Sequence, residues 1–334
     1  MEMTQNFIGL SRPQTGLSLL VRQIRFEANG INSYELVDPA GEVLPPFTAG
    51  AHIDIHLPNG AVRQYSLCNA PAERHRYVIA VLRDEKGRGG SKALHDSLRV
   101  QDIVTVSQPR NNFRLVPEAK KVILLAGGIG MTPLKSMAHA LEAAGVPFEL
   151  HYCARNAGCV AFREQLDTPW EHGQLHFHFD HGDPARGLDI AGLLGAPGDG
   201  THLFYCGPAG FMKACAEAAS HWPAGTVHFE HFKAPEPAPN EAGTTGAPGS
   251  FMVKIASTGA MLEVPAERSI ADVLEAAGVR IETSCQAGLC ATCKIRYLEG
   301  EVDHRDYILG ADEQGQWLTA CVSRATSGVL VLDL

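Results

Sequence analysis

Short apolar runs separated by turn residues dominate the first third of the chain. Turn sequences such as Asp38–Gly41 and Pro58–Gly60 stand between them. The runs are rich in β-branched residues and occupy Leu17–Phe26, Ala51–Leu57, Tyr77–Arg83 and Val100–Val106. Strands at this spacing predict a small antiparallel β-barrel over residues 1–116.

From residue 117 to 233 the pattern changes to buried strands that alternate with helices. Lys121–Leu125 is a continuous apolar run, typical of a parallel strand covered on both faces, and a helix is expected to end at Ala144. Further strands are expected at Phe148–Cys153, Leu175–Phe179, His202–Cys206 and Val227–Glu230. The alternation predicts an α/β doubly wound sheet, whose ligands bind beyond the carboxyl ends of the strands.

The last part of the chain is set apart by its composition. Residues 234–249 alternate Pro with other residues and then turn rich in Gly and Thr, which predicts a linker. Residues 250–334 then begin a new unit. A hairpin is expected from Phe251–Ser257 and Met261–Val264, a capped helix at Ser269–Ala277 and a final strand at Val329–Leu334. These elements predict a compact α+β module.

Composition and charge narrow the functional classes. The chain has 334 residues, 45% of them hydrophobic, and a formal net charge of −9. This length suggests two or three globular domains, and the charge gives no basic stripe for nucleic acid or anionic lipid. The first residues lack the pattern of an export signal, and the longest apolar run is too short to span a bilayer. Nine cysteines without an export signal predict a reducing, cytoplasmic location.

Four of these cysteines have the spacing of an iron–sulfur site. Cys285, Cys290 and Cys293 stand close together, and Cys321 follows much later. This is the spacing by which plant-type ferredoxins hold a [2Fe–2S] cluster, and Gly288 suits a loop that turns its amides toward sulfur. A zinc site remains an alternative, although structural zinc usually uses two CxxC pairs. Cys68, Cys153, Cys159 and Cys215 are interpreted as small apolar residues.

Two segments of the predicted barrel are suited to bind an anion. Arg63, Tyr65 and Ser66 are expected to line one surface of a strand. Together these side chains could bind a flavin; the alternative is an ordinary strand face. Gly87–Ser91 leads into a helical run from Lys92, where a serine cap and free amides would bind phosphate. A simple capped helix is the alternative for the second segment.

Glycine-rich turns also follow two strands of the predicted parallel sheet. Ala126–Pro133 lets backbone approach a pyrophosphate but is not a GxGxxG fingerprint, and Cys206–Met212 opens another helix. Asp180 and Asp183 follow a strand and would repel the 2′-phosphate of NADPH, whereas Arg155 would favour it. Histidines 172, 176, 178, 181 and 202 lie nearby, but no carboxylate or cysteine completes a ligand set, so a metal site is not favoured there.

Taken together, the motifs resemble the phthalate dioxygenase reductase family over essentially the full length. The matching segments are residues 63–69, 87–91, 126–133, 206–212 and 228–232, together with the cysteine quartet. The resemblance implies an FMN-binding barrel, an NAD-binding α/β domain and a ferredoxin domain of β-grasp fold. It also implies electron transfer from NADH to FMN to [2Fe–2S] and on to a separate Rieske-type aromatic-ring dioxygenase, with a monomer as the expected state.

The resemblance also assigns site residues. On the flavin side it implies Arg63, Tyr65, Ser66, Leu67, Arg88, Gly89, Gly90 and Ser91. On the nicotinamide side it implies Gly128, Thr132, Cys206 and Phe232, with Ser66, Thr132 and Cys206 beside the reacting groups. A reductase of the same build that serves an O-demethylase or another monooxygenase is the main alternative. An iron–sulfur redox sensor, which would need no nicotinamide site, is the remote one.

Overall fold

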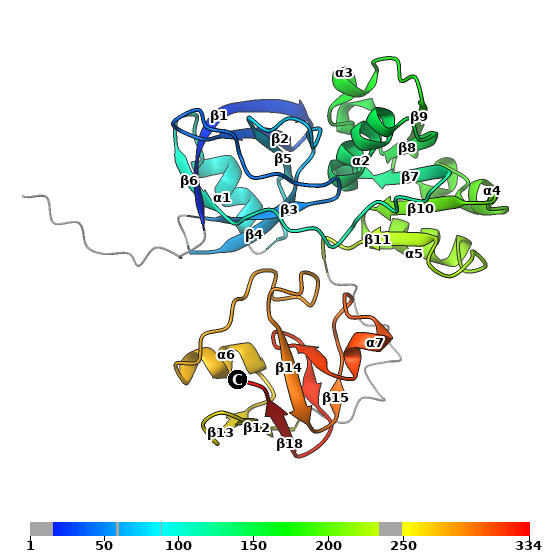
Figure 1. Cartoon of the computed structure of the whole chain (residues 1–334). Helices are drawn as coiled ribbons and strands as arrows, with labels where there is room; N and C mark the ends of the chain where they lie inside the picture. The colour runs from blue at the N-terminus through cyan, green and yellow to red at the C-terminus, as the bar shows by residue number, and fades with distance from the viewer. Residues whose placement is uncertain (1–15, 58–59, 88, 234–248) are drawn as a thin grey trace, which may run out of the picture.

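The computed structural model describes residues 16–57, 60–87, 89–233 and 249–334. The predicted linker, except Gly249, lies outside the described residues, as do Arg88 and part of the turn at 58–60. The chain forms three units, each with a sheet of its own. Figure 1 shows the first two side by side, with the third below their junction.

The first unit is an antiparallel barrel in the strand order β4-β3-β6-β1-β2-β5. Leu67 bridges to Ile79, which brings the two edge strands β4 and β5 together and closes the sheet. Its elements are β1 (Leu17–Ala28), β2 (Ile31–Val37), β3 (His52–His56), β4 (Val62–Ser66), β5 (Tyr77–Leu82), α1 (Gly90–Ser97) and β6 (Ile103–Val106). The barrel was predicted, but β2 was not, because Asn32, Ser33 and Glu35 interrupt its apolar residues.

The second unit is a parallel sheet in the order β11-β10-β7-β8-β9. Alternate residues of β7 enter two separate cores, one packed against α2 and the other against α4 and α5. Both faces of the sheet are therefore covered, as a doubly wound fold requires. The elements are β7 (Lys121–Gly127), η1 (Gly128–Gly130), α2 (Met131–Ala144), β8 (Phe148–Ala154), η2 (Ala157–Cys159), α3 (Arg163–Leu166), β9 (Gly173–Phe179), η3 (Pro184–Arg186), α4 (Ile190–Leu194), β10 (Thr201–Cys206), α5 (Ala209–Ala218) and β11 (Val227–Glu230).

The third unit is a mixed sheet in the order β13-β12-β18-β14-β16, with a two-stranded ribbon of β15 and β17. Ser269 caps α6, as the sequence predicted, and Asp272 completes a capping box with it; Ile270 and Leu274 pack on the sheet. The elements are β12 (Phe251–Ile255), β13 (Met261–Val264), α6 (Ile270–Ala276), β14 (Lys294–Glu299), β15 (Val302–Asp303), α7 (Ala311–Gln314), β16 (Trp317–Thr319), β17 (Arg324–Ala325) and β18 (Val329–Leu332).

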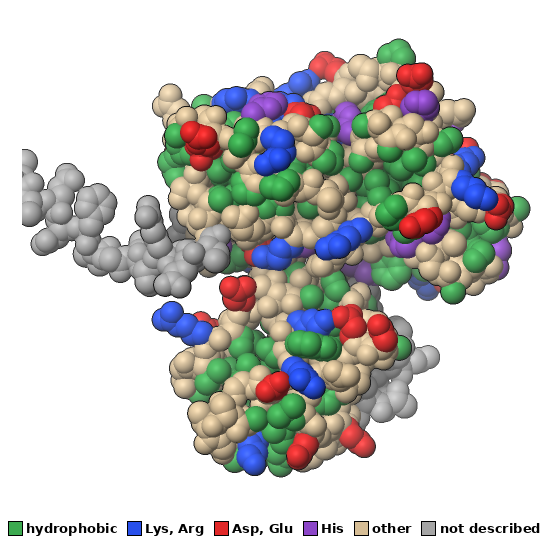
Figure 2. Space-filling model, in the orientation of Figure 1, with side chains coloured by type: hydrophobic (Ala, Val, Ile, Leu, Met, Phe, Trp, Pro, Cys, Tyr) green, Lys and Arg blue, Asp and Glu red, His purple; other side chains and the backbone are tan. Residues whose placement is uncertain are grey.

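Charged side chains are mixed on the surface. On the face drawn in Figure 2, Lys and Arg are interspersed with Asp and Glu over all three units. The third unit joins the other two through a narrower region. None of the helices in the described residues is both long enough and apolar enough to span a membrane.

Candidate functional site

The four cysteines of the predicted cluster site converge. Cys285, Cys290 and Cys293 lie on the loop between α6 and β14, and Cys321 follows β16. Cys285 hydrogen-bonds to the side chains of Cys290 and Cys321, and Cys293 hydrogen-bonds to that of Cys321. All four are free thiols, so the structure gathers four sulfur ligands without joining any of them in a disulfide.

The loop around these thiols fits an iron–sulfur cluster. Leu289 donates its backbone N–H to Cys285 Sγ over 3.3 Å, the kind of amide–sulfur bond that tunes such clusters. Gly288 has φ +69°, and a Cβ there would lie 2.8 Å from Val322 Cγ2. A side chain at this position would therefore push the loop away from Cys321, because Val322 is its neighbour in the chain.

On the barrel, Arg63 lies against the start of α1. A Cβ added to Gly90 would lie 2.5 Å from Arg63 Nε, so the side chain crosses the first residue of the helix. The N-cap is Gly89, and no side chain of the described residues caps the helix. A guanidinium beside an uncapped helix start is suited to a phosphate group.

Two predictions for this region were wrong in detail. Ser91 does not cap the helix, because α1 begins at Gly90; its Oγ instead accepts the N–H of Asp84 at 3.0 Å. Ser66 is adjacent to Tyr65 in the chain, so the alternation of β4 does not place it on the face of Arg63 and Tyr65. Ser66 is the last residue of the strand and is turned toward the second unit.

At the carboxyl edge of the parallel sheet, the turns after β7 and β10 touch. A Cβ on Gly130 would lie 2.1 Å from the Cys206 carbonyl oxygen, so only glycine allows this approach. Thr132 is buried and donates its Oγ1–H to the Ile129 carbonyl at 3.0 Å. Burial raises the pKa of the Cys206 thiol, which therefore stays protonated at neutral pH. Gly128, Thr132 and Cys206 thus line one edge, as expected for ligands of a doubly wound fold.

Glu230 completes this edge and was not assigned a role from the sequence. It ends β11 and pairs in register with Cys206 on β10. Its carboxylate Oε2 accepts a hydrogen bond from Ser66 Oγ across the boundary between the two units, at 3.4 Å. The residue as a whole is half-buried, but burial of its carboxyl raises the pKa from 4.5 to about 8. A carboxylate at the end of the last parallel strand is the signal that could have found it.

The cysteine loop docks on the barrel. Ser284, which precedes the first ligand, donates to the buried Asp54 carboxylate of β3 at 2.8 Å. Asn112 donates its side-chain N–H to the carbonyl of Cys290 at 3.3 Å. His231, directly after Glu230, meets the Tyr307 ring at 5.8 Å between centroids. The cluster loop therefore contacts both other units near the edge where Ser66 and Glu230 meet.

The remaining residues predicted for the nucleotide side lie at the same edge of the parallel sheet, whereas Leu67 is fully buried in the barrel core. The backbone N–H groups of Asp180 and His181 donate to Ala154 and Arg155, so the acidic turn and Arg155 are neighbours. Phe232 follows β11 and is 40% exposed. The next residue, Lys233, forms an ion pair with Asp84 of the barrel at 2.5 Å.

Comparison with known proteins agrees with this geometry. Residues 253–326 match the family model of the 2Fe-2S iron–sulfur cluster binding domain. The phthalate dioxygenase reductase of Burkholderia cepacia is 45% identical over 92% of this chain and 94% of its own. A solved phthalate dioxygenase reductase, described as a modular structure for electron transfer from pyridine nucleotides to [2Fe-2S], superposes with a TM-score of 0.72. The two sequences are 44% identical, and the superposition covers 96% of this chain and 98% of the solved chain.

The chain belongs to the phthalate dioxygenase reductase family.

As a phthalate dioxygenase reductase homologue it is an NADH-dependent oxidoreductase. The fold of this family binds FMN and NADH, and the cysteine-bearing domain holds a [2Fe-2S] cluster rather than zinc. Another relative is the tert-butanol monooxygenase / tert-amyl alcohol desaturase reductase subunit of Aquincola tertiaricarbonis. It is 53% identical over 96% of this chain and 97% of its own. Reductases with different named oxygenases therefore share this architecture.

Proposed function

We propose that this chain passes electrons from NADH through FMN and the [2Fe-2S] cluster to a separate Rieske-type oxygenase, with an aromatic-ring dioxygenase of the phthalate class as the first candidate. One observation carries the proposal: the cysteine loop sits on the flavin barrel, with Asn112 bonded to the carbonyl of Cys290 at 3.3 Å. A two-electron donor site and a one-electron acceptor site are thereby adjacent. FMN, when bound, supplies the exchange between two-electron and one-electron chemistry.

The residues at the edge have separate roles in this proposal. Arg63 and the start of α1, with Gly89, Gly90 and Ser91, hold the flavin phosphate, and Arg88 belongs to the same segment. Tyr65, Ser66 and Leu67 flank the flavin ring. The alternation of β4 supports this role for Tyr65, because it places the ring on the same face as Arg63.

On the nicotinamide side, Gly128, Thr132, Cys206 and Phe232 position the ring of NADH. Glu230 adds a carboxyl whose pKa of about 8 keeps it protonated at neutral pH. A neutral carboxyl bonded to Ser66 avoids a buried negative charge where hydride leaves the nicotinamide. Cys285, Cys290, Cys293 and Cys321 are the cluster ligands.

We propose the domain limits 1–116 for the flavin domain, 117–233 for the nucleotide domain, 234–249 for the linker and 250–334 for the ferredoxin domain, and the separate sheet of each unit supports this division. The free state of all nine cysteines supports the predicted cytoplasmic location. A monomer is proposed from the family resemblance.

A second candidate is a reductase of the same build for a monooxygenase or O-demethylase. The 53% identity to the tert-butanol monooxygenase reductase, against 45% to the Burkholderia phthalate enzyme, favours it specifically. The two candidates share every step inside this chain. They differ only in the acceptor.

Transfer to a panel of oxidised oxygenases separates the candidates. The protein is reduced anaerobically with NADH and mixed with a phthalate-class dioxygenase, a Rieske monooxygenase and an O-demethylase, and the rate of reduction of each Rieske centre is followed by stopped flow. Fast reduction of the phthalate-class enzyme alone supports the first candidate, and fast reduction of the others alone supports the second. Bleaching of the flavin and cluster without transfer to any oxygenase would contradict both.

A further inference from the structure

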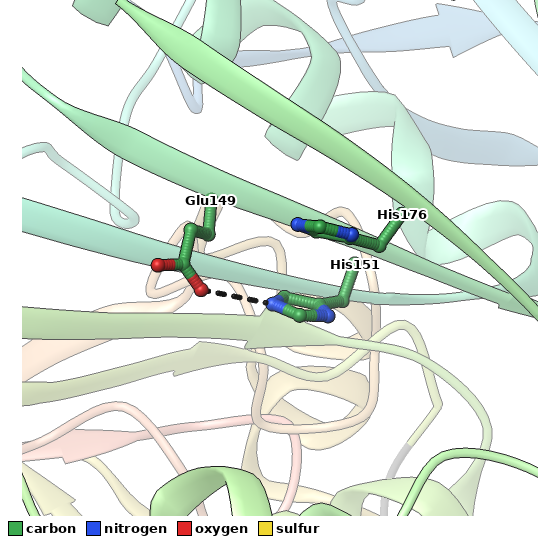
Figure 3. Close-up of side chains that lie close together, drawn as sticks. All are labelled: Glu149, His151 and His176. Atoms are coloured by element: carbon green, nitrogen blue, oxygen red, sulfur yellow. Dashed lines mark hydrogen bonds and ion pairs between the residues drawn. The ribbon is translucent and has the colours of Figure 1, made fainter.

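Three side chains on the parallel sheet form a ligand set outside the electron-transfer site. Glu149 and His151 project from β8, and His176 projects from β9, where it pairs in register with His151 (Figure 3). One nitrogen or oxygen atom from each lies within 4.8 Å of the other two. The sequence alone did not complete this set, because Glu149 stands 27 positions before His176 and only the pairing of the strands joins them.

The contacts of His151 match those of a histidine that binds a metal. Its Nε2 faces Glu149 Oε2 at 3.4 Å, and its Nδ1 lies 3.0 Å from His178 Nε2. A metal-ligating imidazole usually bonds its second ring nitrogen to a neighbouring acceptor, which fixes the ring and its tautomer. His178 is placed to be that acceptor for His151. His151 Nε2 is then left with its lone pair directed at the carboxylate, an arrangement that a cation between them stabilises.

A cationic side chain lies beside the ligand set. Lys121 Nζ contacts Glu149 Oε1 at 2.6 Å and leaves Oε2 directed at His151. The ammonium group opposes a second cation nearby, so it is expected to weaken metal binding without blocking it.

We propose that Glu149, His151 and His176 bind one divalent transition-metal ion of the zinc type. Two imidazoles and one carboxylate are a known zinc ligand set with room for a water molecule, and imidazole favours zinc, copper or nickel over magnesium or calcium. Tetrahedral zinc holds its ligand atoms ~3.3 Å apart, so the side chains must close from their present spacing by rotation about their χ angles. β9 is an edge strand of the sheet, and the ion would tie it to β8.

The test uses the full holoprotein with its cluster loaded. The protein is dialysed against buffered Zn²⁺, and zinc and iron are then counted by elemental analysis, with Mg²⁺ in a parallel series. About one zinc per chain is expected with the iron content unchanged, together with a rise in Tm of about 5 °C near saturation. Magnesium is expected to give neither. Zinc taken up only as iron is lost would place it at the cysteines and overturn the proposal.

Variants locate the ion. His176→Gln should weaken zinc binding at least ~10-fold, since it removes one of three protein ligands. Lys121→Met should tighten binding several-fold, because it removes the competing ammonium. The matched control is His202→Gln. His202 on β10 stacks on His228 of β11 in the same sheet, with their ring nitrogens 3.1 Å apart, and neither histidine belongs to the ligand set.

Iron content and the rate of NADH oxidation with an artificial acceptor report whether each variant is folded. If His176→Gln does not fold, Glu149→Gln replaces it with the same expected loss. Equal zinc affinity in the wild type and the ligand variant, or equal losses in the ligand variant and His202→Gln, would overturn the proposal.

Discussion

The buried carboxyl of Glu230 makes stability depend on pH in a defined direction. Its pKa in the folded chain, about 8, lies above the 4.5 expected when it is exposed. Below pH 4.5 both states hold the proton, and the carboxyl adds no pH dependence. Between the two values only the folded state keeps the proton, so stability falls as pH rises. Above pH 8 both states are ionised and the loss is complete.

The magnitude follows from the size of the pKa change. A rise from 4.5 to about 8 corresponds to about 5 kcal/mol of lost stability at pH 9 relative to pH 4.5. Glu230→Gln keeps a polar group beside Ser66 but cannot ionise, so it removes this loss. For a unit the size of the barrel plus the nucleotide domain, the variant should exceed the wild type in Tm by roughly 10 °C at pH 9 and by little at pH 5.

Thermal unfolding from pH 5 to pH 9, followed by the release of flavin fluorescence, measures this difference. Comparison of wild type and variant at each pH cancels the other titrating groups. Glu217→Gln is the matched control, because this exposed residue forms only a 3.8 Å surface ion pair with Lys213. A Tm difference between wild type and Glu230→Gln that is the same at pH 5 and pH 9 would refute the buried, protonated carboxyl.

Three further predictions concern the cluster and the joints between units. Cys321→Ala should remove the visible cluster spectrum while NADH still reduces the flavin; an intact cluster would contradict the ligand assignment. Gly130→Ala should destabilise by about 1–3 kcal/mol in chemical denaturation, because its Cβ meets the Cys206 carbonyl, whereas Gly210→Ala has open space around it and should not. Ser284→Ala removes one of the two hydrogen bonds between the cysteine loop and the barrel among the described residues, and it should cost about 1–3 kcal/mol of docking, because the buried Asp54 Oδ1 then keeps only Gln64 Nε2 as a donor. Stopped flow should then show slower flavin-to-cluster transfer at an unchanged rate of flavin reduction; equal slowing of both would count against a docking role.

Local patterns determined much of this protein. The cysteine spacing needed only the order of residues along one loop and one cysteine after a later strand, and the structure brings all four thiols together. The parallel strands were predicted because buried strands read as continuous apolar runs, as at Lys121–Leu125. Ser269 predicted the capped start of α6, and the structure confirms this cap. Each of these signals depends on neighbours in sequence, which periodicity and capping chemistry report directly.

Tertiary structure alone decided the contacts between distant segments. The Ser66–Glu230 bond joins residues 164 positions apart, and the bond of Ser284 to Asp54 spans 230. No periodicity links such positions, because their meeting depends on how whole sheets pack and on which edge each strand ends. Glu149 and His176 likewise come together only through the pairing of β8 with β9. The sequence around these residues had not favoured a metal site. The sequence therefore determined the cofactors that the units are built for, and packing decided which carboxyl, amide and imidazole groups surround them.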